Sequence, residues 1–183
     1  GGGVSPLFIG ARKGWAGHDD PFRPFNGSID DIRIYDRALS AEEVSTLYRL
    51  ESPNHFAEMN STVDLEMIWV ENTSASNLLS VGELSTWLDA SEAKFMTTSG
   101  GSNSPPGNGE AIAKWSDRSG NGYDAIPNPS GTAQTWESNS LNSKPTVSFS
   151  GSNSNMAIDG SEIDFDGWSK LHVFAVLQIN GGT

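Results

Sequence analysis

The chain has 183 residues, a formal net charge of −12 and no cysteine. The negative charge argues against nucleic acid or an anionic membrane surface as the partner, because basic surfaces recognise both. Without cysteine the chain can form neither a disulfide framework nor a thiolate zinc site. The sequence contains no apolar run near the ~20 residues that span a bilayer, so this segment is not expected to insert into a membrane.

The stretch Phe25–Tyr48 carries the clearest local signals. Asn26 and Gly27 tolerate positive φ, so this pair predicts a tight turn. The residues that follow alternate in polarity, which predicts a strand with isoleucines on one face. The isoleucine face holds Ile32 and Ile34, and the other face holds Asp31, Arg33 and Tyr35.

A short helix near residues 41–50 is expected next. Ser40 and Glu43 have the spacing of a capping box, in which each side chain binds the other residue's backbone N–H. Val44, Leu47 and Tyr48 then fall on one helical face, which predicts the side that docks on the rest of the protein.

As a whole, Phe25–Tyr48 with the preceding strand Leu7–Gly10 resembles the closing segment of a laminin-G-like jelly-roll domain of the concanavalin A-like lectin/glucanase superfamily. The resemblance implies that residues 1–50 are the C-terminal part of such a domain. Residues 51–83 are rich in Ser, Asn and Thr and are interpreted as a linker, with one apolar run at Val63–Val70.

A second, weaker resemblance to the same family covers residues 84–183. Its strand signal at Leu84–Leu88 is followed by the motifs Trp87–Ser91 and Trp115–Gly122. These imply the N-terminal part of a second laminin-G-like domain. The last strand, Leu171–Ile179, is apolar on both faces, which is typical of a strand in the middle of a sheet.

These signals together predict an all-β chain, an incomplete antiparallel jelly-roll β-sandwich of the laminin-G/concanavalin A-like type with one short helix. Two arrangements remain open. The parts could belong to two separate truncated domains, or the tail half and the head half could pair within this chain, as in a circular permutant.

Glu162, Asp164 and Asp166 are the strongest catalytic candidates. On a strand, these carboxylates would share one face. The triplet resembles the E-x-D-x-E signature of retaining glucanases with this fold, which place a nucleophile and an acid/base about 5 Å apart. The last position of the triplet holds an aspartate, whose side chain is one methylene shorter than that of glutamate. Residues that favour loops lie on both sides of the triplet. An acidic surface loop is therefore the favoured interpretation.

Calcium is the candidate cofactor. In the sequence DRSGNGYD, a turn around Gly120–Gly122 could bring together the oxygens of Asp117, Asn121 and Asp124, which are ligands that calcium prefers. The alternative is a β-turn with solvated acids, because two carboxylates and one amide are few ligands for a calcium ion.

Among the aromatic residues, Trp15, Trp136 and Trp168 lie beside Gly, Ser and Asn and are candidate platforms for sugar stacking. Trp87 and Trp115 lie in the family-like motifs and are expected in the core. His172 lies within an apolar strand, where a hydrogen-bonded sheet residue is the better interpretation than a metal ligand.

The favoured function is a non-catalytic binding or adhesion module of a large extracellular or cell-surface protein, recognising glycans or other extracellular proteins. This rests on the resemblance, because a fold does not fix a function. One alternative is a glycoside hydrolase, or its ancillary module, that uses Glu162, Asp164 and Asp166. The other is a purely structural spacer in a repeat array.

Overall fold

The computed structural model describes residues 7–12, 23–51, 84–91, 93, 96–98, 104–158 and 170–180. Their elements follow in chain order: β1 (Phe8–Ile9), β2 (Ala11–Arg12), β3 (Arg23–Pro24), β4 (Asn26–Tyr35), α1 (Ala41–Glu51), β5 (Leu84–Leu88), β6 (Met96–Thr98), β7 (Glu110–Trp115), β8 (Ala125–Pro127), β9 (Thr135–Leu141), β10 (Lys144–Ser150), β11 (Met156–Ile158) and β12 (His172–Ile179).

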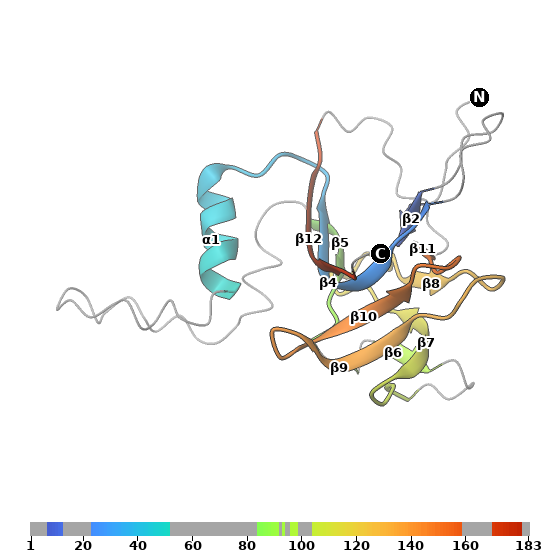
Figure 1. The fold of residues 1–183 in the computed structure, drawn as a ribbon. Coiled ribbons are helices and arrows are strands. Elements are labelled where there is room, and N and C mark those ends of the chain that lie inside the picture. Colours follow the sequence, from blue (N-terminus) through green and yellow to red (C-terminus); the bar gives the residue numbers. More distant parts are fainter. Residues whose placement is uncertain are drawn as a thin grey trace, which may run out of the picture.

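The described strands confirm the all-β prediction. They form a curled antiparallel sheet in the order β1-β11-β8-β7-β9-β10-β4-β12, with β5 added to β4 and β6 to β7, beside a small β2–β3 pair. In Figure 1, α1 stands on one side of β4 and β12, and β8 and β11 lie on the other. This arrangement is that of a jelly roll with one short helix.

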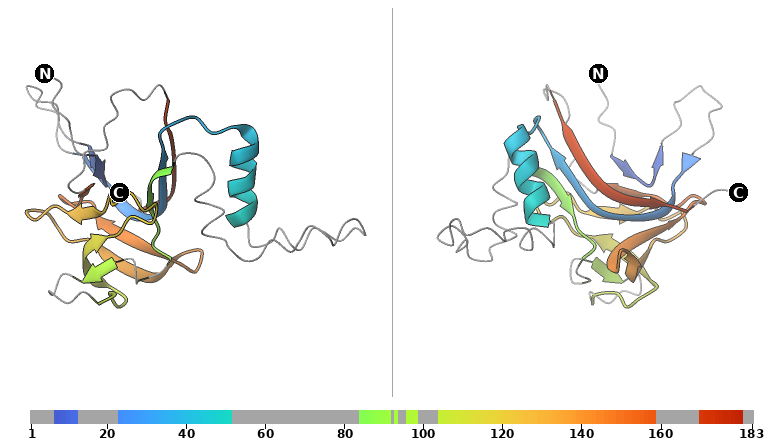
Figure 2. Two further views of the ribbon diagram at one scale, coloured as in Figure 1. Left: turned by 180° about the vertical axis from the view of Figure 1, so that it is seen from behind. Right: turned by 60° about the vertical axis from the view of Figure 1, so that its left-hand side comes forward.

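Strand β4 connects the two parts of the chain. Its first half pairs with β10, its second half pairs with β5, and β12 runs along its other edge. Figure 2 shows β4 and β12 side by side as two curved ribbons. The N-terminal and C-terminal parts therefore share one sheet, which is the pairing that the sequence left open. The assignment of residues 1–50, 51–83 and 84–183 to separate domains stays a prediction.

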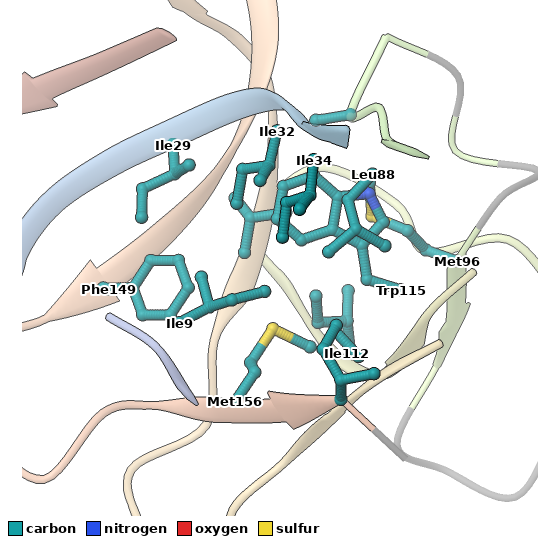
Figure 3. Close-up of a cluster of buried hydrophobic side chains, with 14 residues drawn as sticks. Ile9, Ile29, Ile32, Ile34, Leu88, Met96, Ile112, Trp115, Phe149 and Met156 are labelled. Carbon is teal, nitrogen blue, oxygen red and sulfur yellow. The ribbon is translucent and has the colours of Figure 1, made fainter. Parts of the chain in front are cut away.

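The main core collects side chains from strands far apart in the sequence. Figure 3 shows Ile32 and Ile34 of β4 packed with Leu88 of β5, and Phe149 of β10 near Ile9 of β1. The isoleucine face expected for β4 is thus confirmed. Gly10 is required here, because a Cβ on it would lie 2.4 Å from the Phe149 ring.

Helix α1 docks on the opposite face of β4 and β5. Leu47 and the half-buried Val44 pack against a second cluster that includes Tyr35 and Trp87. The capping box is confirmed, since the Ser40 N–H donates to Glu43 Oε2 at 2.8 Å and the Glu43 N–H to Ser40 Oγ at 3.2 Å. Tyr48, expected on the docking face, is instead 71% exposed.

Two further expectations are wrong. Asn26 and Gly27 form the start of β4 and not a turn. A Cβ on Gly27 would lie 2.1 Å from the carbonyl oxygen of Gln178, so the glycine serves a close approach of β12. The strand at 172–179 exists, but it lies at the edge of the sheet among the described strands and not in its middle.

Candidate functional site

A row of hydrogen-bonding side chains crosses four neighbouring strands of the sheet. Gln178 of β12 lies opposite Ser28 of β4, Ser28 opposite Ser148 of β10, and Ser148 opposite Thr135 of β9. Directly paired residues project from the same face of a sheet. With strands roughly 4.8 Å apart, the row is about 14 Å long. We call it the polar row.

The polar row lies on the face opposite the core because polarity alternates along each strand. In β10, Val147 and Phe149 are fully buried in the main core, and Ser148 between them points the other way. In β4, Ile29 faces the core and Ser28 does not. Within the row, Gln178 is exposed, Ser148 and Thr135 are half-buried, and Ser28 is buried.

A second set of polar groups flanks the row. Thr146 lies opposite Glu137, whose Oε1 accepts a hydrogen bond from Thr135 Oγ1 at 2.9 Å. The hydroxyl of Thr146 is buried and has no hydrogen-bond partner among the described residues. Because a buried polar group usually has a partner, this hydroxyl is suited to a bound water or a ligand group.

Asp30 is an acidic group of β4 on this face, opposite Val176 of β12. Its Oδ1 accepts a hydrogen bond from the Ala90 N–H at 2.8 Å. Burial raises the pKa of Asp30 above its ordinary value, although the Ala90 N–H acts in the other direction.

A charged cluster next to the face holds β4 and β5 together. The guanidinium carbons of Arg33 and Arg118 lie 4.7 Å and 4.2 Å from the centre of the Trp87 ring. Trp87 Nε1 donates to Asp31 Oδ1 at 2.9 Å, and Asp31 also binds Arg33. Arg118 forms an ion pair with Asp89, and burial lowers the pKa of Arg118. These charged groups therefore bind one another and Trp87 within the fold.

The calcium candidates lie in a loop that is closed by hydrogen bonds. Asp117 Oδ1 accepts from the N–H groups of Trp87 and Ser119, and its Oδ2 from the Ser119 hydroxyl and the Gly122 and Tyr123 N–H groups. Asp124 binds the Asp117 N–H and the Lys114 ammonium. The Asn121 amide donates to the carbonyls of Leu84 and Ser85.

Through these hydrogen bonds the loop links β5 to the segment after β7. Within the described ranges, no three His, Cys, Asp or Glu side chains gather as a metal-binding group. Calcium at Asp117, Asn121 and Asp124 stays a prediction, and a cation there would have to compete with the hydrogen bonds to Asp117.

The remaining sequence candidates fall in different places. Trp15, Trp168 and the triplet Glu162, Asp164 and Asp166 lie outside the described residues. Trp136 is half-buried against the main core, and its Nε1 donates to the Ala90 carbonyl at 2.9 Å. Trp87 and Trp115 are buried, as predicted.

His172 is a hydrogen-bonded sheet residue, which confirms the prediction. Its Nδ1 accepts from the Leu39 N–H at 2.9 Å, and its ring packs edge-on against Phe174. The sequence does not predict the polar row as a whole. The signal that could have found part of it is the alternation of Thr146, Ser148 and Ser150 with buried apolar residues.

Residues 2–45 match the family model for the concanavalin A-like lectin/glucanases superfamily, laminin-G type. This stretch contains β4 and the beginning of α1 and is laminin-G-like, as its motif predicted. No curated protein and no solved structure matches the chain. In the described part of the protein, no helix has the length and hydrophobicity needed to cross a membrane.

Proposed function

We propose that this laminin-G-like chain is a non-catalytic binding module of a secreted or cell-surface protein, and that its polar row binds the hydroxyl groups of a glycan. The superfamily match supports a lectin-like binding module in general terms. The observation that carries the finer proposal is the polar row, Gln178–Ser28–Ser148–Thr135, on a face that also holds Asp30 and Thr146.

The chemistry of the row suits sugars. Hydroxyl and amide side chains can both donate and accept hydrogen bonds, as sugar hydroxyls do. Ser28 is buried and its hydroxyl bonds that of Ser140, so a sugar would contact the accessible members of the row, Gln178, Ser148 and Thr135. The row is longer than one sugar ring, so neighbouring rings of an oligosaccharide could reach different members. A protein ligand that presents polar side chains is the alternative partner, and the experiment below separates the two.

Four carboxylates of the described part are engaged within the fold. Asp31 and Asp89 are held by arginines, Asp117 by backbone N–H groups, and Asp124 by Lys114. A retaining glycosidase needs two carboxyl groups free to act on one bond. The hydrolase alternative rests on Glu162, Asp164 and Asp166, and its test is β-glucan hydrolysis by the wild type and Glu162→Gln. Turnover that this change abolishes would establish an enzyme.

The binding proposal is tested on a panel of immobilised oligosaccharides, with and without calcium. For any sugar that binds, Ser148→Ala should weaken binding roughly fivefold, since one hydrogen bond contributes about 1 kcal/mol. Ser130→Ala, at an exposed turn, is the matched control and should leave the affinity unchanged.

Two results would overturn the proposal: no sugar binds, or both serine variants bind like the wild type. Loss of binding in a chelator, restored by calcium, would in addition assign calcium to the module.

A further inference from the structure

The outer edge of β12 is open among the described strands. The strand pairs with β4 along one side, from His172 to Ile179, and no described strand lies on its other side. In an antiparallel sheet, such an edge presents N–H and C=O groups that can accept another strand. Figure 2 shows β12 as a long, regular ribbon beside β4.

Most of the apolar side chains of β12 are exposed. Val173 is 55% exposed, Leu177 50% and Ile179 68%. Val173 and Leu177 lie opposite the buried Ile34 and Ile29, so they continue the core-facing side of the sheet. Leu171, just before the strand, is also exposed.

Natural edge strands are usually protected by charged residues or proline. Residues 171–180, LHVFAVLQIN, contain no Asp, Glu, Lys, Arg or Pro, although the chain carries a net charge of −12. The register shift near Phe174 comes from an extra residue on β4, because Arg33 and Asp30 are further apart in sequence than their partners Phe174 and Val176. Strand β12 itself is regular.

The pattern of β12 is complementary to itself. If two copies of the strand pair antiparallel with Ala175 opposite Ala175, Val173 lies opposite Leu177 and Leu171 opposite Ile179. His172 then lies opposite Gln178, and Phe174 opposite Val176. Each apolar residue meets an apolar residue and each polar one a polar one. Cross-strand pairs of this kind each contribute roughly 0.2–1 kcal/mol.

We propose that β12 pairs antiparallel with β12 of a second copy of this chain, about a two-fold axis at Ala175. The pairing joins the two sheets and places the exposed apolar side chains of both copies next to one another. Because each copy offers the same edge to the other, the contact is closed at a dimer. A foreign strand of unrelated sequence would not match this pattern at every position.

The test measures the mass of the full 183-residue chain by light scattering. The wild type should have twice the mass of one chain, and Val173→Lys and Leu177→Glu should each be monomeric. An equimolar mixture of these two variants should restore the dimer, because the lysine introduced in one copy then lies opposite the glutamate introduced in the other. The pair Leu171→Lys and Ile179→Glu makes the same prediction if one of the first variants fails to fold.

Tyr48→Lys is the matched control, since Tyr48 is an exposed apolar residue on α1, away from the edge. This variant should remain dimeric. The proposal is overturned by a wild type that stays monomeric at all concentrations or forms open-ended larger assemblies. It is equally overturned if folded variants at positions 173 and 177 stay dimeric, or if mixing them gives only monomers.

Discussion

His172 joins the edge strand to the segment that leads into the helix. Its Nδ1 accepts the Leu39 N–H at 2.9 Å, and Leu39 is buried. His172→Leu removes the acceptor and leaves that N–H unpaired, so we expect a loss of about 1–3 kcal/mol in the free energy of unfolding. Urea denaturation measures the loss, and hydrogen exchange of the Leu39 amide should become faster.

The rescue variant for this bond is His172→Asn, whose side-chain oxygen can accept from the same N–H. It should recover part of the stability and the slow exchange. Equal protection of the Leu39 amide in the wild type and in His172→Leu would contradict the assigned bond.

Asp30 gives a second prediction at the scale of a single residue. Burial raises its pKa above the ordinary 3.8, so the folded chain binds the proton more tightly than the unfolded chain does. The contribution of Asp30 to stability is therefore largest below pH 3.8 and falls as the pH rises through the raised pKa. Asp30→Asn keeps an acceptor for the Ala90 N–H and removes the charge.

We expect Asp30→Asn to be more stable than the wild type at pH 7 and to lose that advantage at pH 3. Thermal unfolding at both pH values is the measurement. A variant that is less stable than the wild type at pH 7 would mean that the charged form is favoured in the folded protein, contrary to the burial argument.

At the scale of an element, α1 depends on Glu43. Arg37 donates to both carboxylate oxygens and the Ser40 N–H to one of them. The hydrogen bond from Arg37, followed by that from Ser40, lowers the pKa of Glu43 from 4.5 to about 2. Because the pKa of Glu43 is lower in the folded chain than in the unfolded chain, its charged carboxylate stabilises the folded chain at pH values above about 4.5. This contribution to stability is lost as the pH falls from about 4.5 to about 2.

Glu43→Gln should therefore flatten the pH dependence of stability between those values, because glutamine keeps the capping bond but does not titrate. Glu42→Gln, an exposed change in the same turn, serves as the control. If both variants follow the wild-type acid profile, the Arg37–Glu43 contact does not contribute to stability.

How far the sequence predicts each element depends on how local its determinants are. The alternation in β4 was enough to assign Ile32 and Ile34 to the core, and Ser40 with Glu43 was enough to locate the start of α1, because both signals lie within one element. The side predicted for Tyr48 is wrong, since the sheet under α1 accommodates Leu47 and Val44 but does not reach Tyr48.

The candidate site is predictable only in part for the same reason. Ser148 could be placed on a polar face from β10 alone. Its neighbours Ser28 and Gln178 come from strands more than a hundred residues apart in the sequence, so only their register brings them together. The turn predicted at Gly27 is wrong because the glycine is required by the close approach of β12, which is a tertiary contact.

For the whole molecule, the central question is whether the two parts of the chain fold as one unit. Strand β4 comes from the N-terminal part, and its neighbours β5, β10 and β12 all come from the C-terminal part. Its core residue Ile34 is 4% exposed and packs in the cluster that contains Trp115. A cavity at Ile34 should therefore weaken the packing of residues that follow much later in the sequence.

We expect Ile34→Ala to cost about 2–5 kcal/mol. Because the core is shared, tryptophan fluorescence and far-UV circular dichroism should shift together to lower urea as one cooperative transition. The exposed Tyr48→Ala is the control and should leave the midpoint nearly unchanged. Two separate transitions, with the later one unaffected by Ile34→Ala, would show instead that residues 84–183 fold without β4, and the polar row would then lack the strand at its centre.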